Sequence, residues 1–167
     1  MAAIWTTPKT WQVGEIVTAD MLNTQVRDNL DFLRLREDTP LNHAAQSNQT
    51  TLTTSSTVFV DMHPTLLTVT LTTQGAPVLL MLAGTYQHNV VGAECAFTLT
   101  VDGVNIGDPA YGLQLCQPAA ANLHQPFSWS GVRAMGVGAH IIRARWRTNT
   151  GVLTASFNLS LTAIELI

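Results

Sequence analysis

The feature that most restricts the fold is a two-residue alternation of apolar and polar side chains, which recurs along residues 50–167. Leucine and valine alternate with threonine over 66–72, and the same period returns over 157–165. Such alternation is typical of strands with one buried face, and threonine and valine suit a pleated surface. It predicts strands over 57–60, 66–72, 77–86, 97–101, 104–106, 127–132, 140–147 and 157–165.

Turn signals separate these segments. Asp102-Gly103 is a strong hairpin signal between two apolar runs, and Asn149-Thr150-Gly151 indicates a second turn. No helical period occurs among the predicted strands. About eight strands joined by turns predict a mainly β fold, an antiparallel β-sandwich of the jelly-roll kind.

A segment with the hydrophobic period of a helix precedes the predicted strands. Thr18 is suited to cap a helix over about 19–36, Asp20 favours its positive end, and Pro40 marks its end. Apolar side chains three and four residues apart form one stripe, and in a heptad register Asn29 would be a buried polar residue that fixes the pairing. The predicted helix contacts are Leu22, Val26, Asn29, Leu30 and Leu33. Two alternatives stay open: an oligomeric helix bundle, and one helix docked on its own β domain.

Residues 1–17 read as an extended arm with two tryptophans, Trp5 and Trp11. Each indole ring can remove about 150–250 Å² from water, so both need a surface to bury against. That surface is either their own domain or a neighbouring subunit or larger scaffold. The expected organisation is an arm over 1–17, an amphipathic helix over 18–38, a linker over 39–49 and a β-sandwich over 50–167.

Charge is scarce and unevenly placed. The 167 residues include 8 basic and 11 acidic side chains, a net charge of −3, and ten of these nineteen fall within residues 1–38. This composition argues against a disordered acidic chain and against an electrostatic nucleic-acid binder. We expect no membrane insertion and no signal peptide, because no apolar run has the required length or position. A surface so poor in charge suits contact with neighbouring subunits.

Motifs for catalysis are missing from the sequence. The five histidines show no metal-ligand spacing, no glycine-rich loop opens a helix, and no GxSxG elbow occurs. A hydrolase would need carboxylates or histidines gathered in a cleft, which spacing alone does not indicate. We therefore expect no catalytic residue, no metal and no cofactor.

Three other features could contact partners. Arg143, Arg145 and Arg147 share one face of a predicted strand, where they could bind a phosphate or a sugar acid or form a row of ion pairs. Tyr111, in a loop over 107–112, is the best candidate for an exposed contact. Cys95 and Cys116 are expected to be reduced thiols, with a disulfide as the alternative.

One segment resembles a known family. The residues from Trp11 to Ala19 read Trp-x-x-Gly-Glu-x-Val-Thr-Ala, and Leu-Asn-x-x-Val-Arg-Asp-Asn-Leu follows over 22–30. Together they resemble the opening segment of small structural proteins of tailed bacteriophages and prophages, over about the first 35 residues. The later sequences Gly84-Thr85-Tyr86, Val101-Asp102-Gly103, Arg145-Trp146-Arg147-Thr148 and Ala163-Ile164-Glu165-Leu166 look like the jelly-roll ends of phage fibre and decoration proteins, a style shared with TNF-like and C1q-like trimers.

The resemblance implies a virion protein, assembled in the host cytoplasm as a homotrimer, with an N-terminal attachment element and a β domain facing outward. Its partners would be its own copies and other virion proteins of the tail or the capsid. A tail-associated fibre or minor tail protein is preferred over a capsid decoration protein. A receptor- or glycan-binding module, with Tyr111 and the loops over 104–126 as its contact region, is the alternative from another class.

Overall fold

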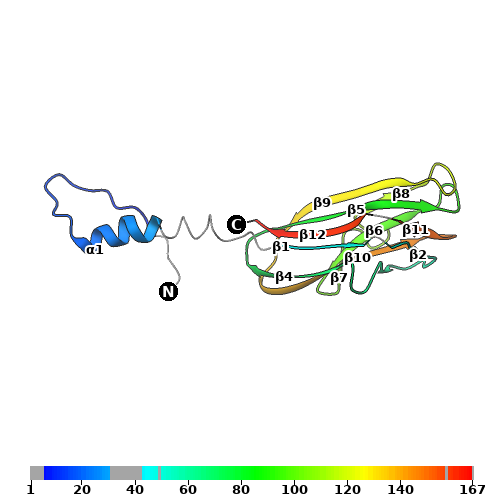
Figure 1. Ribbon diagram of the computed structural model, residues 1–167, viewed down its shortest axis with the longest axis horizontal. Helices are drawn as coiled ribbons and strands as arrows, with labels where there is room; N and C mark the ends of the chain where they lie inside the picture. Colours follow the sequence, from blue (N-terminus) through cyan, green and yellow to red (C-terminus); the bar gives the residue numbers. More distant parts are fainter. Residues whose placement is uncertain (1–5, 31–42, 49, 157, 167) are drawn as a thin grey trace. The chain divides into compact units, whose positions relative to one another are not determined.

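The computed structural model describes residues 6–30, 43–48, 50–156 and 158–166. The chain divides into two compact units, Met1–Pro40 and Leu41–Ile167. Figure 1 shows a short helical segment in the first unit and strands throughout the second. No helix within these described ranges is long and apolar enough to cross a membrane.

The first unit contains the predicted helix. α1 spans Ala19–Leu22, and the Thr18 hydroxyl accepts a hydrogen bond from the Met21 amide at 3.3 Å, which confirms the predicted N-cap. A π-helical turn, η1, follows over Asn23–Arg27, and the chain is helical through Leu30. The rest of the predicted helix, residues 31–38, lies outside the described residues.

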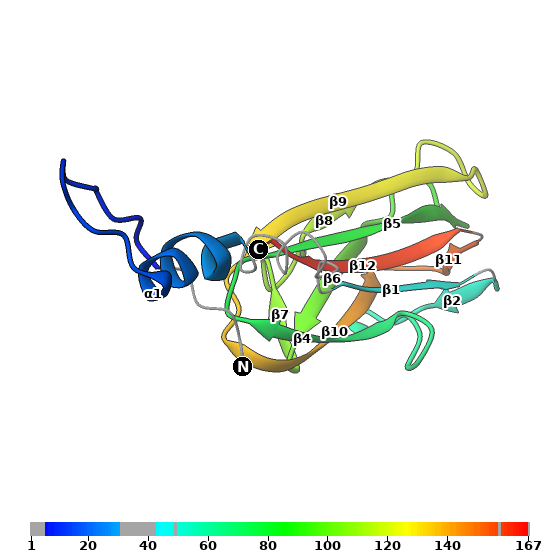
Figure 2. The same cartoon turned by 60° about the vertical axis from the view of Figure 1, so that its left-hand side comes forward.

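The described residues of the second unit form twelve strands in two antiparallel sheets. The first sheet contains β1 (His43–Asn48), β2 (Leu52–Thr54), β5 (Val78–His88), β9 (Gln125–Arg133), β11 (Leu153–Ala155) and β12 (Leu159–Glu165). The second contains β3 (Val60–Asp61), β4 (Thr68–Gln74), β6 (Cys95–Val101), β7 (Val104–Ile106), β8 (Gln114–Cys116) and β10 (Val137–Thr148). Figure 2 shows the two layers from a second side.

Each sheet is organised around one long strand. In the first sheet β5 pairs with β9 along one edge and with β12 and then β11 along the other. In the second sheet β10 pairs with β4 and β3 on one edge and with β6 on the other. The predicted sandwich of antiparallel strands is therefore confirmed.

Two local differences from the sequence expectation stand out. Residues 43–48, placed in the expected linker over 39–49, instead form β1 and pair with β12 over their whole length. The short strands β2, β8 and β11 also fall where no strand was predicted, and of the strand predicted over 57–60 only Val60 lies in one, β3. The predicted hairpin at Asp102-Gly103 is present between β6 and β7, and both turn residues have positive φ, 52° and 83°.

The core lies between the sheets and follows the predicted alternation. Leu80 and Leu82 of β5, and Leu161 of β12, are fully buried, with each alternate residue turned outward. The Phe97 and Phe127 rings stack across the layers with centroids 4.0 Å apart, and Tyr86 meets both edge-on. Burial of each such leucine contributes about 1.5–3 kcal/mol before chain entropy is counted.

The outward faces of the two sheets differ in charge. The outward side of β10 carries Arg143, Arg145 and Arg147, with Asp61 beside them on β3. The outward positions of the first sheet hold no Asp, Glu, Lys or Arg within its six described strands. The residues at these positions include Leu79, Met81, Ala83 and Thr85 of β5, Ser128, Ser130 and Val132 of β9, and Ser160, Thr162 and Ile164 of β12.

Candidate functional site: the arginine face and its pocket

The three arginines of β10 lie on one face because a strand alternates its side chains, and they do form ion pairs. Arg145 stands directly opposite Asp61, with Nε 3.0 Å from Oδ1, and Arg143 Nη1 lies 3.6 Å from Oδ2 of the same carboxylate. Arg147 Nη2 lies 3.9 Å from Oε2 of Glu94. Three guanidinium groups therefore share two carboxylates, and the row keeps a net positive charge.

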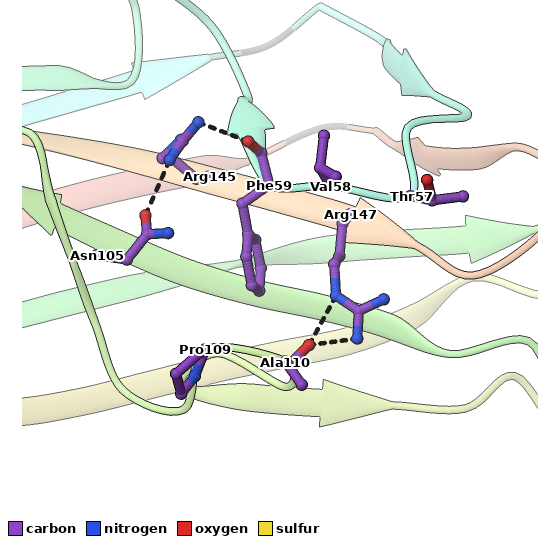
Figure 3. A pocket seen from close by; sticks show the side chains of 8 residues that line it. All are labelled: Thr57, Val58, Phe59, Asn105, Pro109, Ala110, Arg145 and Arg147. Atoms are coloured by element: carbon purple, nitrogen blue, oxygen red, sulfur yellow. Dashed lines mark hydrogen bonds between the residues drawn. The ribbon is translucent and has the colours of Figure 1, made fainter.

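Arg145 and Arg147 also hold two loops against the sheet (Figure 3). Arg145 donates to Oδ1 of Asn105 at 2.9 Å and to the Phe59 carbonyl at 2.5 Å. Arg147 donates through Nε to the Ala110 carbonyl at 2.7 Å, and its Nη2 donates to the same oxygen. The Arg147 guanidinium lies 5.6 Å from the centroid of the Phe59 ring, which is a cation–π contact.

The second of these loops has a fixed backbone. Asp108 and Gly112 exchange backbone hydrogen bonds of 3.0 and 2.8 Å, and Oδ1 of Asp108 accepts from the Ala110 and Tyr111 amides, both at 2.8 Å. Gly112 has φ +69°, and a Cβ there would lie 2.5 Å from the Phe97 carbonyl oxygen. Glycine is therefore required at this position. The loop presents Tyr111 to solvent, with 48% of the residue exposed.

These contacts form the walls of an open pocket of about 490 Å³. Figure 3 shows the Arg145 and Arg147 side chains reaching into it from β10, with the Phe59 ring between them. The lining residues are Thr57, Val58, Phe59, Asn105, Pro109, Ala110, Arg145 and Arg147. Guanidinium N–H groups beside an aromatic ring suit a planar anion such as a sugar carboxylate.

The predicted arm and helix residues are placed by hydrogen bonds within the first unit. Asn29 is buried, with 6% of the residue exposed. Its side-chain oxygen accepts from the Thr6 amide and its side-chain nitrogen donates to the Thr6 carbonyl, both at 2.9 Å. Oε1 of Gln25 accepts from the Lys9 amide at 2.7 Å. Asn29 therefore fixes the returning arm to the helix, a contact that the heptad argument did not include.

The apolar stripe of the helix is open to solvent. Leu22, Val26 and Leu30 are 49%, 48% and 60% exposed. Trp11 is 41% exposed, with the Lys9 ammonium 5.4 Å from its ring centroid. Trp5 and Leu33, the other predicted contacts, lie outside the described residues.

Three of the described histidines have hydrogen-bond partners, and Nδ1 of His63 accepts from the Thr65 and Leu66 amides at 3.2 and 3.0 Å. The fully buried His88 ring accepts from the Val90 amide at 2.9 Å through Nδ1 and donates to the Thr150 carbonyl at 2.9 Å through Nε2. His140 pairs with Asp102 at 2.7 Å. Across the described ranges no group of three or more His, Cys, Asp or Glu side chains is placed to hold a metal ion.

Of the residues that sequence reasoning singled out, Arg145 and Arg147 line the pocket, Arg143 and Tyr111 lie outside its lining, and the other pocket walls were missed. Phe59 falls within a predicted strand, and Asn105 falls within the predicted returning strand of the hairpin. Neither position indicated a pocket. The sequence shows that Asp61 and Glu94 are among the few carboxylates of the β region, but it does not indicate that they pair with the arginines of β10. The signal for those pairings is the strand register, which alternation does not encode.

No protein-family model and no curated protein sequence matches the chain. Among solved structures, that of Eiger TNF from S. frugiperda is similar over 77% of this chain and 94% of its own, with a TM-score of 0.50 and 10% identity. A chain in the structure of infectious bursal disease virus, Gx strain, has a TM-score of 0.48 and 11% identity over 76% of this chain and 32% of its own. A pentameric capsid protein isolated from metagenomic phage sequences has a TM-score of 0.29 and 12% identity over 94% of this chain and 79% of its own.

At such identities a likeness bears on the fold alone, and of these three only the TNF structure reaches a TM-score of 0.5. It confirms the expected fold class, a jelly-roll-like β-sandwich of the TNF kind.

Proposed function

We propose that this chain is a structural protein of a tailed-bacteriophage virion, homotrimeric, joined to the particle through residues 1–38 and carrying its β domain outward. The phage assignment rests on the resemblance of residues 5–30 to the opening segment of phage structural proteins. A tail-associated fibre or minor tail protein is preferred over a capsid decoration protein.

The observation that carries the proposal is the uncharged outward face of the first sheet. Depletion of charged side chains is the compositional mark of an interface core. Leucine, methionine, valine and isoleucine side chains stand among serine, threonine and alanine on this face, while Arg143, Arg145 and Arg147 lie on the outward side of the other sheet. A face of this kind suits packing against further copies of the same chain, as in closed symmetric assemblies.

The exposed helix stripe supports a second contact. Leu22, Val26 and Leu30 lie on a short helix, and an isolated helix of this length is marginal in water. Association of several such stripes, or burial on another virion protein, would remove these side chains from water. Each fully buried leucine or valine would contribute about 1.5–3 kcal/mol.

Light scattering on the full chain tests the assembly, with three times the 18.1 kDa chain mass as the expected result. Met81→Arg places a charge in the centre of the uncharged face and should give monomers. Thr70→Arg places the same charge on the outward side of β4, in the other sheet, and should leave the trimer intact. A monomeric parent chain at micromolar concentration, or equal loss of the trimer in both variants, would overturn the proposed interface.

A reconstruction of the virus particle tests the location. Density for the β domain on the tail supports the preferred assignment, and density on the capsid surface supports the decoration alternative. Absence of the chain from purified particles would contradict both.

The pocket beside Arg147 favours a second candidate function, a receptor- or glycan-binding module. Two guanidinium groups, the Phe59 ring and the nearby exposed Tyr111 could together bind a sugar that carries a carboxylate. Ligand-observed NMR on the unchanged full chain should then show contact with glucuronate and none with glucose.

Two arginine variants test whether glucuronate binds in this pocket. Arg147→Ala should abolish glucuronate binding, whereas Arg143→Ala, in the same row but outside the pocket lining, should retain it. Equal signals for the two sugars, or equal loss in the two variants, would argue against this second function.

A further inference from the structure

Cys95 and Cys116 are placed opposite each other by the sheet register. Cys95 begins β6, Cys116 ends β8, and the antiparallel pairing of these strands makes the two residues direct partners. Direct partners in an antiparallel pair have Cα atoms about 4.5–5.5 Å apart, within the range of about 4.4–6.8 Å that a disulfide requires. The two positions are separated by about twenty residues of chain, so sequence spacing alone did not indicate this pairing.

The two cysteines are not bonded to each other in the structure, and their surroundings differ. Cys95 is fully buried, and its thiol donates to the Ala93 carbonyl at 3.8 Å. Cys116 is half-buried at the end of the short strand β8. Cys116 is thus the thiol that a reagent from solvent can reach first.

We propose that Cys95 and Cys116 form an intramolecular cross-strand disulfide when the folded protein meets a disulfide oxidant such as oxidised glutathione. The Cys116 thiolate attacks one sulfur of the oxidant, forms a mixed disulfide and releases one glutathione thiolate. The Cys95 thiolate then attacks the sulfur of Cys116 and displaces the second glutathione. The two cysteines lose two electrons and two protons in total, and one oxidised glutathione becomes two reduced molecules.

The disulfide would restrain the loop over 107–112, which forms one wall of the pocket. β8 is a three-residue edge strand, and the chain between the two cysteines contains β7 and the loop over 107–112 that forms a wall of the pocket. A cross-link across this segment restricts the unfolded chain, which is the main source of disulfide stabilisation in the chain-entropy account. The oxidised form should therefore resist unfolding better than the reduced form, and the covalent link should also keep β8 from separating from β6.

The reaction should be slow at neutral pH, because the thiolate is the attacking species. Burial raises the pKa of the Cys95 thiol to about 12, with the neighbouring Cys116 as a smaller cause. Burial also raises the pKa of the Cys116 thiol. Both shifts reduce the thiolate fraction near pH 7, so the rate should increase towards pH 9.

The test incubates the full reduced chain with oxidised glutathione under native conditions and measures intact mass, a peptide map and the melting temperature. The expected result is loss of two hydrogens, a peptide joining Cys95 to Cys116, and a melting temperature higher by about 5 °C or more. Reducing agent should reverse all three. Cys116→Ser should show no such mass change and no melting shift on oxidation.

Three results would overturn the proposal: both thiols still titratable after incubation at pH 9, a stable glutathione adduct on Cys116 as the end product, or a disulfide between two chains. Each would show that Cys95 and Cys116 do not form the cross-strand disulfide in the folded chain. Because the readouts are made on the purified chain, they are independent of whether it belongs to a virus particle.

Discussion

His140 and Asp102 form the clearest titratable pair of the β unit. The hydrogen bond to Asp102 raises the pKa of His140, and the bond to the Gly136 carbonyl adds to the rise. The same bond to His140 lowers the pKa of Asp102, with help from the Ile141 amide at 2.8 Å. The pair fastens the β6–β7 turn to β10.

The directions of the two pKa shifts determine how the stability contribution of this pair depends on pH. The contribution of His140 is complete below pH 6.5 and is lost as the pH rises through its raised pKa, whereas that of Asp102 is complete above pH 3.8 and is lost as the pH falls through its lowered pKa. We expect His140→Gln to lower the melting temperature more at pH 5 than at pH 9. The loss in the free energy of unfolding should stay below about 1 kcal/mol, because solvent screens the exposed Asp102.

Thermal unfolding of both proteins at the two pH values provides the measurement. His124→Gln is the control, since His124 is an exposed loop residue and its loss should matter little at either pH. An equal difference between parent and His140→Gln at pH 5 and pH 9 would show that the ion pair contributes nothing.

At the scale of the elements, one buried carboxylate joins the end of β12 to the turn between β4 and β5. Glu165 is fully buried, and its Oε1 accepts from the Gln74 amide at 2.7 Å and the Ala76 amide at 3.0 Å. We expect Glu165→Leu to lower the free energy of unfolding by about 2–4 kcal/mol, because two backbone amides lose their buried acceptor. Glu165→Gln keeps an acceptor oxygen and should lose less.

Urea denaturation measures both variants. Ser160→Ala, on the outward side of the same strand, is the matched control and should change the unfolding free energy by less than about 0.5 kcal/mol. If Glu165→Leu behaves like the control, the carboxylate is not what holds the turn.

Strand length decides how much of the fold the sequence could predict. β4, β5, β6, β10 and β12 each contain seven or more residues, and their alternation was visible without a structure. β8 and β11 contain three residues each, too few to show a period, and exist because a neighbouring strand offers hydrogen-bonding groups. For the same reason the arginine row was predictable from β10 alone, while Asp61, Phe59 and Ala110 required the register.

At the scale of the molecule, the two units are independent in composition and in core. Every buried apolar side chain that the structure describes lies between Phe59 and Ala163, and the first unit contributes none. We expect a chain lacking residues 1–40 to remain folded, with a melting temperature within about 3 °C of the parent, and to be missing from assembled particles. Circular dichroism during heating measures the first outcome, and protein analysis of particles grown with the truncated gene measures the second.

Normal incorporation of the truncated chain would show that residues 1–40 are not the attachment element. Failure of the truncated chain to fold would show instead that the β unit depends on the first unit. Met81→Arg in the full chain separates the two roles, since it should lose trimers while residues 1–40 remain available for attachment.

The pairing of β1 with β12 has a consequence for how the protein is made. These strands come from opposite ends of the β unit, with Asn48 beside Leu159 and His43 beside Ile164. While the chain leaves the ribosome, β1 has no partner until nearly the whole β unit has been synthesised, so closing the first sheet is a late and slow step. Prematurely terminated chains would leave the edges of β5 and β1 open, and the cell would meet them as aggregation-prone fragments before they could enter an assembly.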